Sequence, residues 1–268
     1  MRAIAFLIIL AWPAHARAAA QVFPRSDEVF RKLLADPRQI QLWASYYRHE
    51  GRNTGDVGLG HSWGMRRWLW KEWTLQRDIE GLANSRFLLS GSVNEFQTVD
   101  FFANLPLEFR RREFSGIFML FHESSHLGDD YIRRTNDKGF RYSVDGLRTV
   151  LSLEPPGPAR IYIGGSHVLH SIPSPDRGAI QAGLELTGPS HKMLGRYPAQ
   201  PYLAQDFHWK ETVRWNGNSH TVLGVKLKIE GVIRSMRMQV GYFNGHSPYG
   251  QFYTRHEHYA DIGMGFDL

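Results

Sequence analysis

The last ten residues, Tyr259 to Leu268, read YADIGMGFDL and alternate between two kinds of side chain without a break. In an extended chain, successive side chains point to opposite faces. One face of this segment is therefore wholly apolar and carries Ala260, Ile262, Met264, Phe266 and Leu268. The other face carries only Tyr, Asp and Gly. A transmembrane β-barrel needs such a strand, because lipid requires the apolar face and an enclosed lumen accepts small and acidic residues.

The first twenty residues have the features of a secretory signal peptide. Arg2 gives a positive start, and the apolar stretch at residues 3–12 is too short to span a bilayer. Small-residue cleavage patterns then end at Ala16 and Ala20, so we expect export with a cut after one of these two residues. The chain has no cysteine, which excludes a lipid-modified N-terminal cysteine and a disulfide framework.

Composition narrows the class of protein further. Without residues 1–20 the chain keeps 26 acidic residues and 30 basic ones, and the basic residues are scattered, so we expect no nucleic-acid partner. Roughly 250 residues fit one large β domain. After the signal there is no run of 18 apolar residues, which excludes a helical membrane span. The high aromatic content of 13% falls near the ends of alternating segments, as interfacial girdles require.

Alternating segments bounded by turn residues recur along the rest of the chain. They begin near residues 40, 57, 73, 94, 115, 139, 160, 178, 203, 220, 232 and 252. This pattern predicts an all-β fold, an antiparallel transmembrane β-barrel of about twelve strands, whose even number returns both ends to the periplasmic side. The expected organisation is a signal peptide at 1–20, a periplasmic segment at 21–38 and the barrel at 39–268.

The periplasmic segment is expected to contain one short helix. Ser26 can cap a helix that runs to about Ala35, and Asp36-Pro37 then stops it. We expect this helix to pack as an anchoring turn on the barrel mouth, although a lid or plug is an alternative.

Ionic residues are frequent at positions that the alternation assigns to the lumen. These are Asp78, Glu80, Asp100, Glu108, Arg141, Asp145, Arg160, Glu185, Asp206, Lys210, Lys226, Lys228, Arg237, Arg255, Glu257 and Asp261. Charges of both signs at this density favour a cross-linked, narrow interior over a wide pore. We therefore expect a barrel that conducts slowly or not at all.

The segment FMLFHESSHLGDD, residues 118–130, is where nucleophilic, basic and acidic residues crowd together. On a strand His122 and Ser124 share one face, which places an imidazole beside the hydroxyl that it could deprotonate, as serine acyl hydrolysis requires. Glu123 points to the other face, so no orienting third residue can be named. The alternative is a polar strand end at the level of the lipid headgroups.

A metal site is a further alternative for the same segment. His122 and His126, with Asp129 or Asp130, supply suitable donors, but residues i and i+4 of a strand lie about 13 Å apart. They could meet only if the chain turned at Ser124, so we expect no metal and no cofactor.

The H-x-S spacing of His122 and Ser124 resembles the active-site strand of two families of outer-membrane lipid hydrolases, the outer membrane phospholipases A and the lipid A deacylases. In those enzymes the His and Ser face the lipid, which implies His122 as base and Ser124 as nucleophile here. The chain departs from their pattern after the nucleophile, where they have Asn and this chain has Ser125.

Three longer blocks carry a resemblance over nearly all of the mature chain. They are residues 33–38 (LLADPR), 122–131 (HESSHLGDDY) and 244–253 (NGHSPYGQFY). Together they resemble the bacterial family filed as domain of unknown function 1207. This resemblance implies a secreted outer-membrane barrel without an established activity, and it assigns no catalytic residue.

The sequence thus predicts an outer-membrane β-barrel of the Gram-negative envelope with a structural, lipid-contacting or narrow-transport role. The enzyme alternative is a serine-dependent lipid acyl hydrolase that uses His122 and Ser124. A soluble periplasmic β-sandwich that acts as a binding module is the second alternative. The expected partners are outer-membrane lipids or lipopolysaccharide, and the barrel-assembly machinery through the C-terminal strand.

Overall fold

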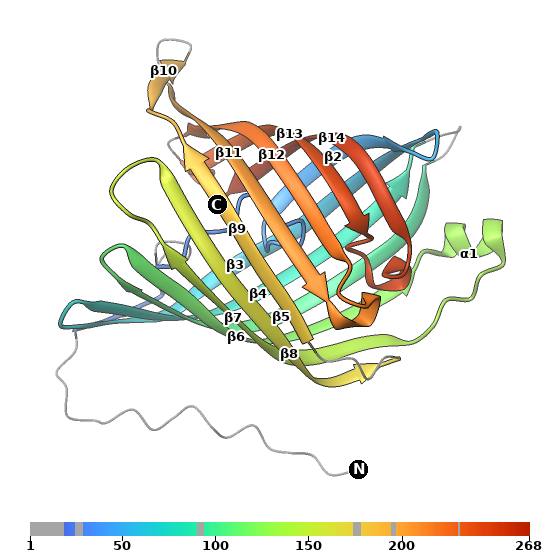
Figure 1. Ribbon diagram of the computed structural model, residues 1–268, viewed down its shortest axis with the longest axis horizontal. Coiled ribbons are helices and arrows are strands. Elements are labelled where there is room, and N and C mark those ends of the chain that lie inside the picture. Colours follow the sequence, from blue (N-terminus) through green and yellow to red (C-terminus); the bar gives the residue numbers. More distant parts are fainter. Residues whose placement is uncertain (1–18, 25–28, 90–93, 174–177, 194–196, 230) are drawn as a thin grey trace.

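The computed structural model describes residues 19–24, 29–89, 94–173, 178–193, 197–229 and 231–268. These residues form one antiparallel sheet that closes on itself as a barrel (Figure 1). The strands of the wall are β2 (Leu42–His49), β3 (Arg52–Trp70), β4 (Trp73–Leu88), β5 (Glu95–Arg111), β6 (Phe114–Leu127), β7 (Tyr142–Leu153), β8 (Ala159–Ile172), β9 (Gly178–Thr187), β11 (Tyr197–Lys210), β12 (Gly217–Lys228), β13 (Ser235–His246) and β14 (His256–Asp267). Each pairs with the next, and β14 pairs with β2, which confirms the twelve-stranded antiparallel barrel.

The alternation of apolar and polar faces expected for the C-terminal strand is confirmed. Ile262 and Met264 of β14 are 59% and 40% exposed on the outside of the wall, whereas Asp261 and Asp267 are buried. A closed barrel with an apolar outer face also excludes the soluble β-sandwich, which would pack two sheets face to face.

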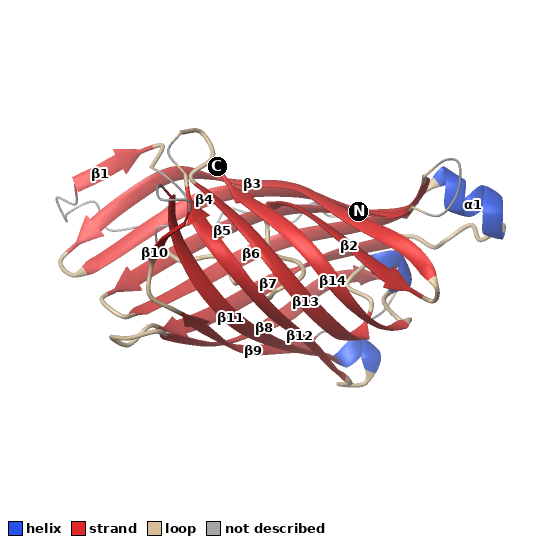
Figure 2. Cartoon of the chain, turned by 90° about the horizontal axis from the view of Figure 1, so that it is seen from above, coloured by secondary structure: helices blue, strands red, loops and turns tan. Residues whose placement is uncertain are grey.

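The two ends of the barrel differ, as short periplasmic turns and longer external loops require. The termini of the wall share one end with tight turns, in which Lys71 and Arg112 adopt positive φ angles of 53° and 52°. The other end carries helix α1 (Asp129–Thr135) and the short 3-10 helices η1 (Glu211–Val213) and η2 (Gly250–Phe252) (Figures 1 and 2). In the described residues no helix is long and apolar enough to cross a bilayer.

Two short strands extend the wall at the end that carries the tight turns. Strand β10 (His191–Met193) pairs with β11 as a small hairpin, which explains why the connection between Pro189 and Pro201 is longer than the other turns at this end. Strand β1 (Ala19–Val22) pairs with residues 66–69 of β3. Residues 1–18, which hold most of the expected signal peptide, lie outside the described part of the chain.

The expected N-terminal helix is wrong where it can be compared with the structure. Residues 25–28 lie outside the described residues, and residues 29–35 form an irregular segment rather than a helix. Residues 29–41, which we call the plug, do not rest on the barrel mouth. They contact strands from all sides of the ring and therefore run through the lumen.

Side chains of the wall satisfy the backbone of the plug. Glu108 of β5 accepts the Phe30 N–H at 3.1 Å, and Glu185 of β9 accepts the Leu34 N–H at 2.8 Å. These long-range bonds replace the i to i−4 bonds of a helix, because a buried N–H group needs a partner but not a particular one. The plug is irregular for this reason.

Arg160 of β8 is the main cation that holds the plug. Its guanidinium, 1% exposed, donates to the carbonyl oxygens of Arg31 at 2.9 Å and Lys32 at 3.2 Å. It also donates to Ser152 at 2.7 Å and to Glu185 at 3.1 Å. One buried side chain thus ties three wall strands, β7, β8 and β9, to the plug.

Apolar side chains of the plug form the cores of three small clusters with the inner wall. Leu33 packs in a cluster with Ile117, Met119 and Val150, Ala35 in a second and Ile40 in a third. The chain itself therefore occupies much of the lumen, and the lid-or-plug alternative describes this segment better than the anchoring turn.

Candidate functional site

His122 and Ser124 lie near the outer end of β6, on the face that points away from the lumen. Glu123 and Ser125 are the buried residues of this stretch and face inward, as does Met119, four residues before Glu123. The side chain of His122 is 43% exposed, so it can be reached from outside the barrel. The expectation that the two residues share one face follows from this alternation.

Asp145 of the neighbouring strand β7 is an acidic partner of His122 that the sequence did not identify. It lies directly opposite His122 in the register of β6 and β7. The His122 Nδ1 atom lies 2.7 Å from Asp145 Oδ1, within the range of a strong hydrogen bond. Asp145 was expected in the lumen, which is wrong: its side chain is 46% exposed on the outer face.

This contact fixes the tautomer of the imidazole. A carboxylate can only accept, so Nδ1 of His122 carries the proton and the neutral ring leaves Nε2 as an acceptor. An acceptor nitrogen is what a general base needs. His170 of β8 approaches the other carboxylate oxygen of Asp145, with its Nδ1 atom 3.4 Å from Oδ2.

The Ser124 hydroxyl and the His122 ring make no hydrogen bond to each other in the described part of the chain. In structures without substrate, catalytic hydrogen bonds are often long and tighten only in the complex. The outer face of the barrel therefore carries a histidine that contacts a carboxylate, and a serine two residues further along the same strand.

The alternative of a metal site finds no support in the described residues. No group of three or more His, Asp or Glu side chains is arranged to hold an ion there. His122 instead uses one ring nitrogen for Asp145.

The lumen is lined by charges, as expected. Ten of the predicted lumen residues are buried, namely Asp78, Glu80, Asp100, Glu108, Arg160, Glu185, Asp206, Arg237, Glu257 and Asp261. They form networks of hydrogen bonds and ion pairs, so most of this polarity is structural.

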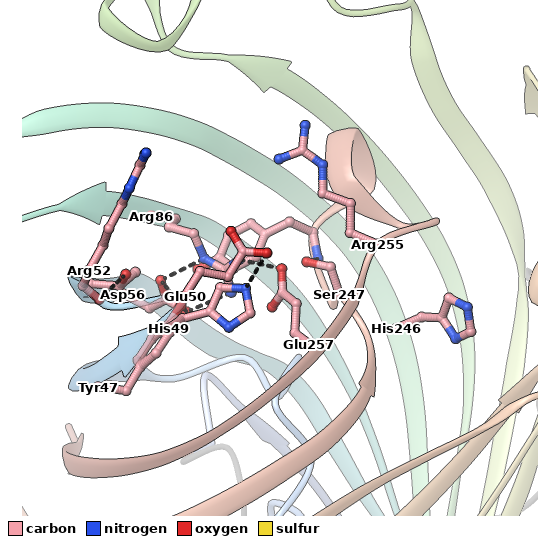
Figure 3. A network of polar contacts seen from close by, with 12 residues as sticks. Tyr47, His49, Glu50, Arg52, Asp56, Arg86, His246, Ser247, Arg255 and Glu257 are labelled. Atoms are coloured by element: carbon pink, nitrogen blue, oxygen red, sulfur yellow. Dashed lines mark hydrogen bonds and ion pairs between the residues drawn. The ribbon is translucent and has the colours of Figure 1, made fainter. Parts of the chain in front are cut away.

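One such network, the Arg86 cluster, joins β2, β3, β4 and β14 (Figure 3). Arg86 donates to Glu257 at 2.7 Å and to Asp56 at 3.1 Å, and its guanidinium lies 4.4 Å from the centre of the Tyr249 ring. The Tyr47 hydroxyl also donates to Asp56, at 3.1 Å. A buried cation between two carboxylates and two aromatic rings cross-links the wall.

Solved structures that resemble the chain are outer-membrane barrels. Outer membrane phospholipase A from Escherichia coli has a TM-score of 0.56 at 14% identity, covering 87% of this chain and 93% of that chain. The dimer of the Salmonella typhi outer membrane phospholipase with bound calcium has a TM-score of 0.54 at 12% identity, with the same coverage. These similarities establish the outer-membrane type of barrel fold.

The comparisons by sequence give the family. No curated protein matches the chain in sequence. A family model described as "protein of unknown function (DUF1207)" matches residues 14–268, and the chain therefore belongs to this family.

Proposed function

We propose that the protein is an outer-membrane lipid acyl hydrolase, with Ser124 as nucleophile, His122 as general base and Asp145 as the residue that orients His122. The observation that carries this proposal is the 2.7 Å contact between His122 and Asp145 on the outer face, with Ser124 on the same face of β6. The likeness in fold to outer membrane phospholipase A agrees with it.

The reaction proceeds in two steps. Ser124 Oγ attacks the ester carbonyl of an acyl chain while Nε2 of His122 takes its proton, and the alcohol leaves with that proton. Water then attacks the acyl-serine with His122 again as base, which releases the fatty acid and restores Ser124. Asp145 stabilises the imidazolium that forms in each step.

The test is the release of fatty acid from phospholipid or lipopolysaccharide by the purified protein in detergent micelles. Ser124→Ala is expected to lower release by more than about 10,000-fold, and Asp145→Asn by about 10,000-fold. Ser219→Ala is the matched control, because Ser219 lies near the outer end of β12 and pairs with the outward-facing Phe207. No release by the wild type, or equal release by Ser124→Ala, would refute the proposal.

A closed lumen supports a second, compatible role as a structural envelope protein or a slow, narrow transporter. The plug fills the interior, so we expect no conductance at the level of a general porin. Planar-bilayer recordings test this, and currents of porin size from the intact protein would contradict it.

For localisation we infer export by the signal peptide, insertion into the Gram-negative outer membrane, and assembly through the C-terminal strand by the barrel-assembly machinery. The apolar outer face of β14 supports contact with membrane lipids or lipopolysaccharide. N-terminal sequencing of the mature protein is expected to find a start after Ala16 or Ala20. A start at Met1 in the outer-membrane fraction would contradict cleavage.

A further inference from the structure

A cavity of about 170 Å³ runs along one side of the plug, inside the barrel and away from the outer-face site. Its outer part is lined by the ends of β6, β7, β11, β12 and β13 and by residues 36–40 of the plug. A buried water molecule needs about 10–15 Å³ of cavity volume, so this cavity has room for roughly ten groups of that size. That is the size of a small organic molecule.

Lys210, the last residue of β11, lines this cavity and is half-buried. Its ammonium makes no hydrogen bond and no ion pair within the described residues. The next residue, Glu211, accepts the Gly178 N–H at 2.8 Å. A half-buried ammonium without a partner is costly, which distinguishes Lys210 from the paired cations of this barrel.

The other charges of the outer cavity are matched. Arg38 of the plug pairs with Glu123 of β6, and Arg148 pairs with Asp36 at 2.7 Å. Neither pair includes the ammonium of Lys210, which makes no direct ion pair with a carboxylate of the cavity wall in the described part of the chain.

Asp100 is the remaining carboxylate whose charge attracts the Lys210 ammonium, and it does not line the cavity. Its oxygens already accept the Ser125 hydroxyl and the Gly250 N–H, the latter at 2.9 Å. Asp100 therefore does not take the place of a bound counter-ion.

Two buried acceptor or donor atoms of the same wall have no partner in the described chain. They are Oε1 of Glu123 and Nδ1 of His246, and both residues line the cavity. His246 lies apart from the Arg86 cluster in Figure 3. Buried polar atoms without partners are rare, and each calls for a group that would complete them.

We propose that this cavity is a binding site for a small carboxylate anion that carries hydroxyl groups, with its carboxylate on Lys210 and its hydroxyls on Glu123 and His246. The ammonium supplies the charge-assisted hydrogen bond, and the carboxylate and imidazole supply partners that a hydroxyl can satisfy as donor and acceptor. This site is independent of the outer-face chemistry, because its residues face the lumen.

Three probes separate the parts of the proposal, measured by ligand-detected NMR on the full-length protein in micelles. Glucuronate carries both features, glucose carries hydroxyls only and propionate carries a carboxylate only. Glucuronate is expected to bind at least tenfold more tightly than either of the others. Equal binding of propionate or glucose, or no binding of glucuronate, would overturn the proposal.

Variants then tie the binding to Lys210. Lys210→Met is expected to weaken glucuronate binding at least tenfold, whereas Lys210→Arg, which keeps the charge, retains most of it. Lys228→Met is the matched control, since Lys228 is an exposed lysine at the opposite end of the neighbouring strand β12. The heat-dependent gel shift of folded barrels verifies each variant, and unchanged binding by folded Lys210→Met would refute the assignment. If Lys210→Met does not fold, Lys210→Gln takes its place with the same expected loss.

Discussion

Replacing Arg160 by Met is expected to release the plug. Met keeps an unbranched apolar stem but removes four hydrogen bonds, those to Ser152, Glu185 and the carbonyls of Arg31 and Lys32. It leaves the Glu185 carboxylate buried, with the Leu34 N–H as a remaining donor. Removing one partner of a buried ion pair costs about 3–5 kcal/mol, because the other charge loses its compensation.

Limited proteolysis measures this cost locally. Tryptic cleavage after Lys32 and Arg38 reports opening, because these side chains are only 14% and 16% exposed in the folded protein, whereas the Arg31 side chain is 49% exposed. When opening is fast relative to cleavage, the rate follows the population of the open plug. Since each 1.4 kcal/mol is a tenfold change, Arg160→Met should speed cleavage by about 100- to 4000-fold.

Arg111→Met is the control, because Arg111 forms an exposed ion pair with Glu72 at the end of the barrel that carries the tight turns. It should leave the cleavage rate unchanged. If Arg160→Met and Arg111→Met are cleaved at the same rate as the wild type, the plug is not held by Arg160 and the reasoning fails.

Three further predictions follow from single groups around the plug. Burial raises the pKa of Glu154, but the hydrogen bond from Arg110 and the charge of Arg31 outweigh it, so the pKa lies below its ordinary value of 4.5. The contribution of Glu154 to stability is therefore complete above pH 4.5 and is lost as the pH falls through the folded-state pKa. Hydrogen exchange of the plug amides should show this as a loss of protection. Protection that is constant from pH 6 to 3 would contradict the prediction. Leu33 is only 1% exposed, so Leu33→Ala should lower the free energy of unfolding, measured by urea titration, by about 2–5 kcal/mol. No change would show that the plug packs loosely. Gly183→Ala would bring a Cβ within 2.2 Å of the Tyr162 side chain and 2.5 Å of the backbone oxygen of Gln205. It should therefore cost about 1–3 kcal/mol, measured in the same way. A neutral effect would show that both the Tyr162 ring and strand β11 can move.

The wall of the barrel could be predicted from the sequence because its signals are local. The alternation of β14 is a property of ten neighbouring residues, and the turns at Lys71 and Arg112 separate strands that pair with their neighbours in the chain. Lipid outside and a crowded lumen inside enforce the same period on every strand. Most of the expected strand starts consequently lie within a few residues of the observed ones.

The plug could not be predicted in the same way, because its partners are distant in sequence. Ser26 and Asp36-Pro37 are local helix signals, but Glu108 and Glu185 offer the backbone of Phe30 and Leu34 other acceptors, 78 and 151 residues away. Tertiary partners of this kind override local propensity.

The candidate site was predictable in part. Alternation placed His122 and Ser124 on one face, but Asp145 follows a loop of 14 residues, whose length does not set the register of the next strand. The alternation expected for this strand was therefore out of phase at Asp145, which lies on the outer face, where a carboxylate can lie at the level of the headgroups. A count from the buried Val150 back along β7 gives the correct face, because Asp145 is an odd number of residues away.

The charges of the lumen and the irregular plug explain each other. Without the plug, Arg160 would lose two backbone acceptors, and Glu108 and Glu185 would each lose an N–H donor. Buried ionic groups that lose partners are strongly destabilising, so wall and plug must fold as one unit. A barrel closed in this way has no continuous wide lumen for general diffusion. The two proposals agree with this closure, because lipid chemistry is assigned to the outer face, where His122 and Asp145 lie, and a small anion to the cavity beside Lys210.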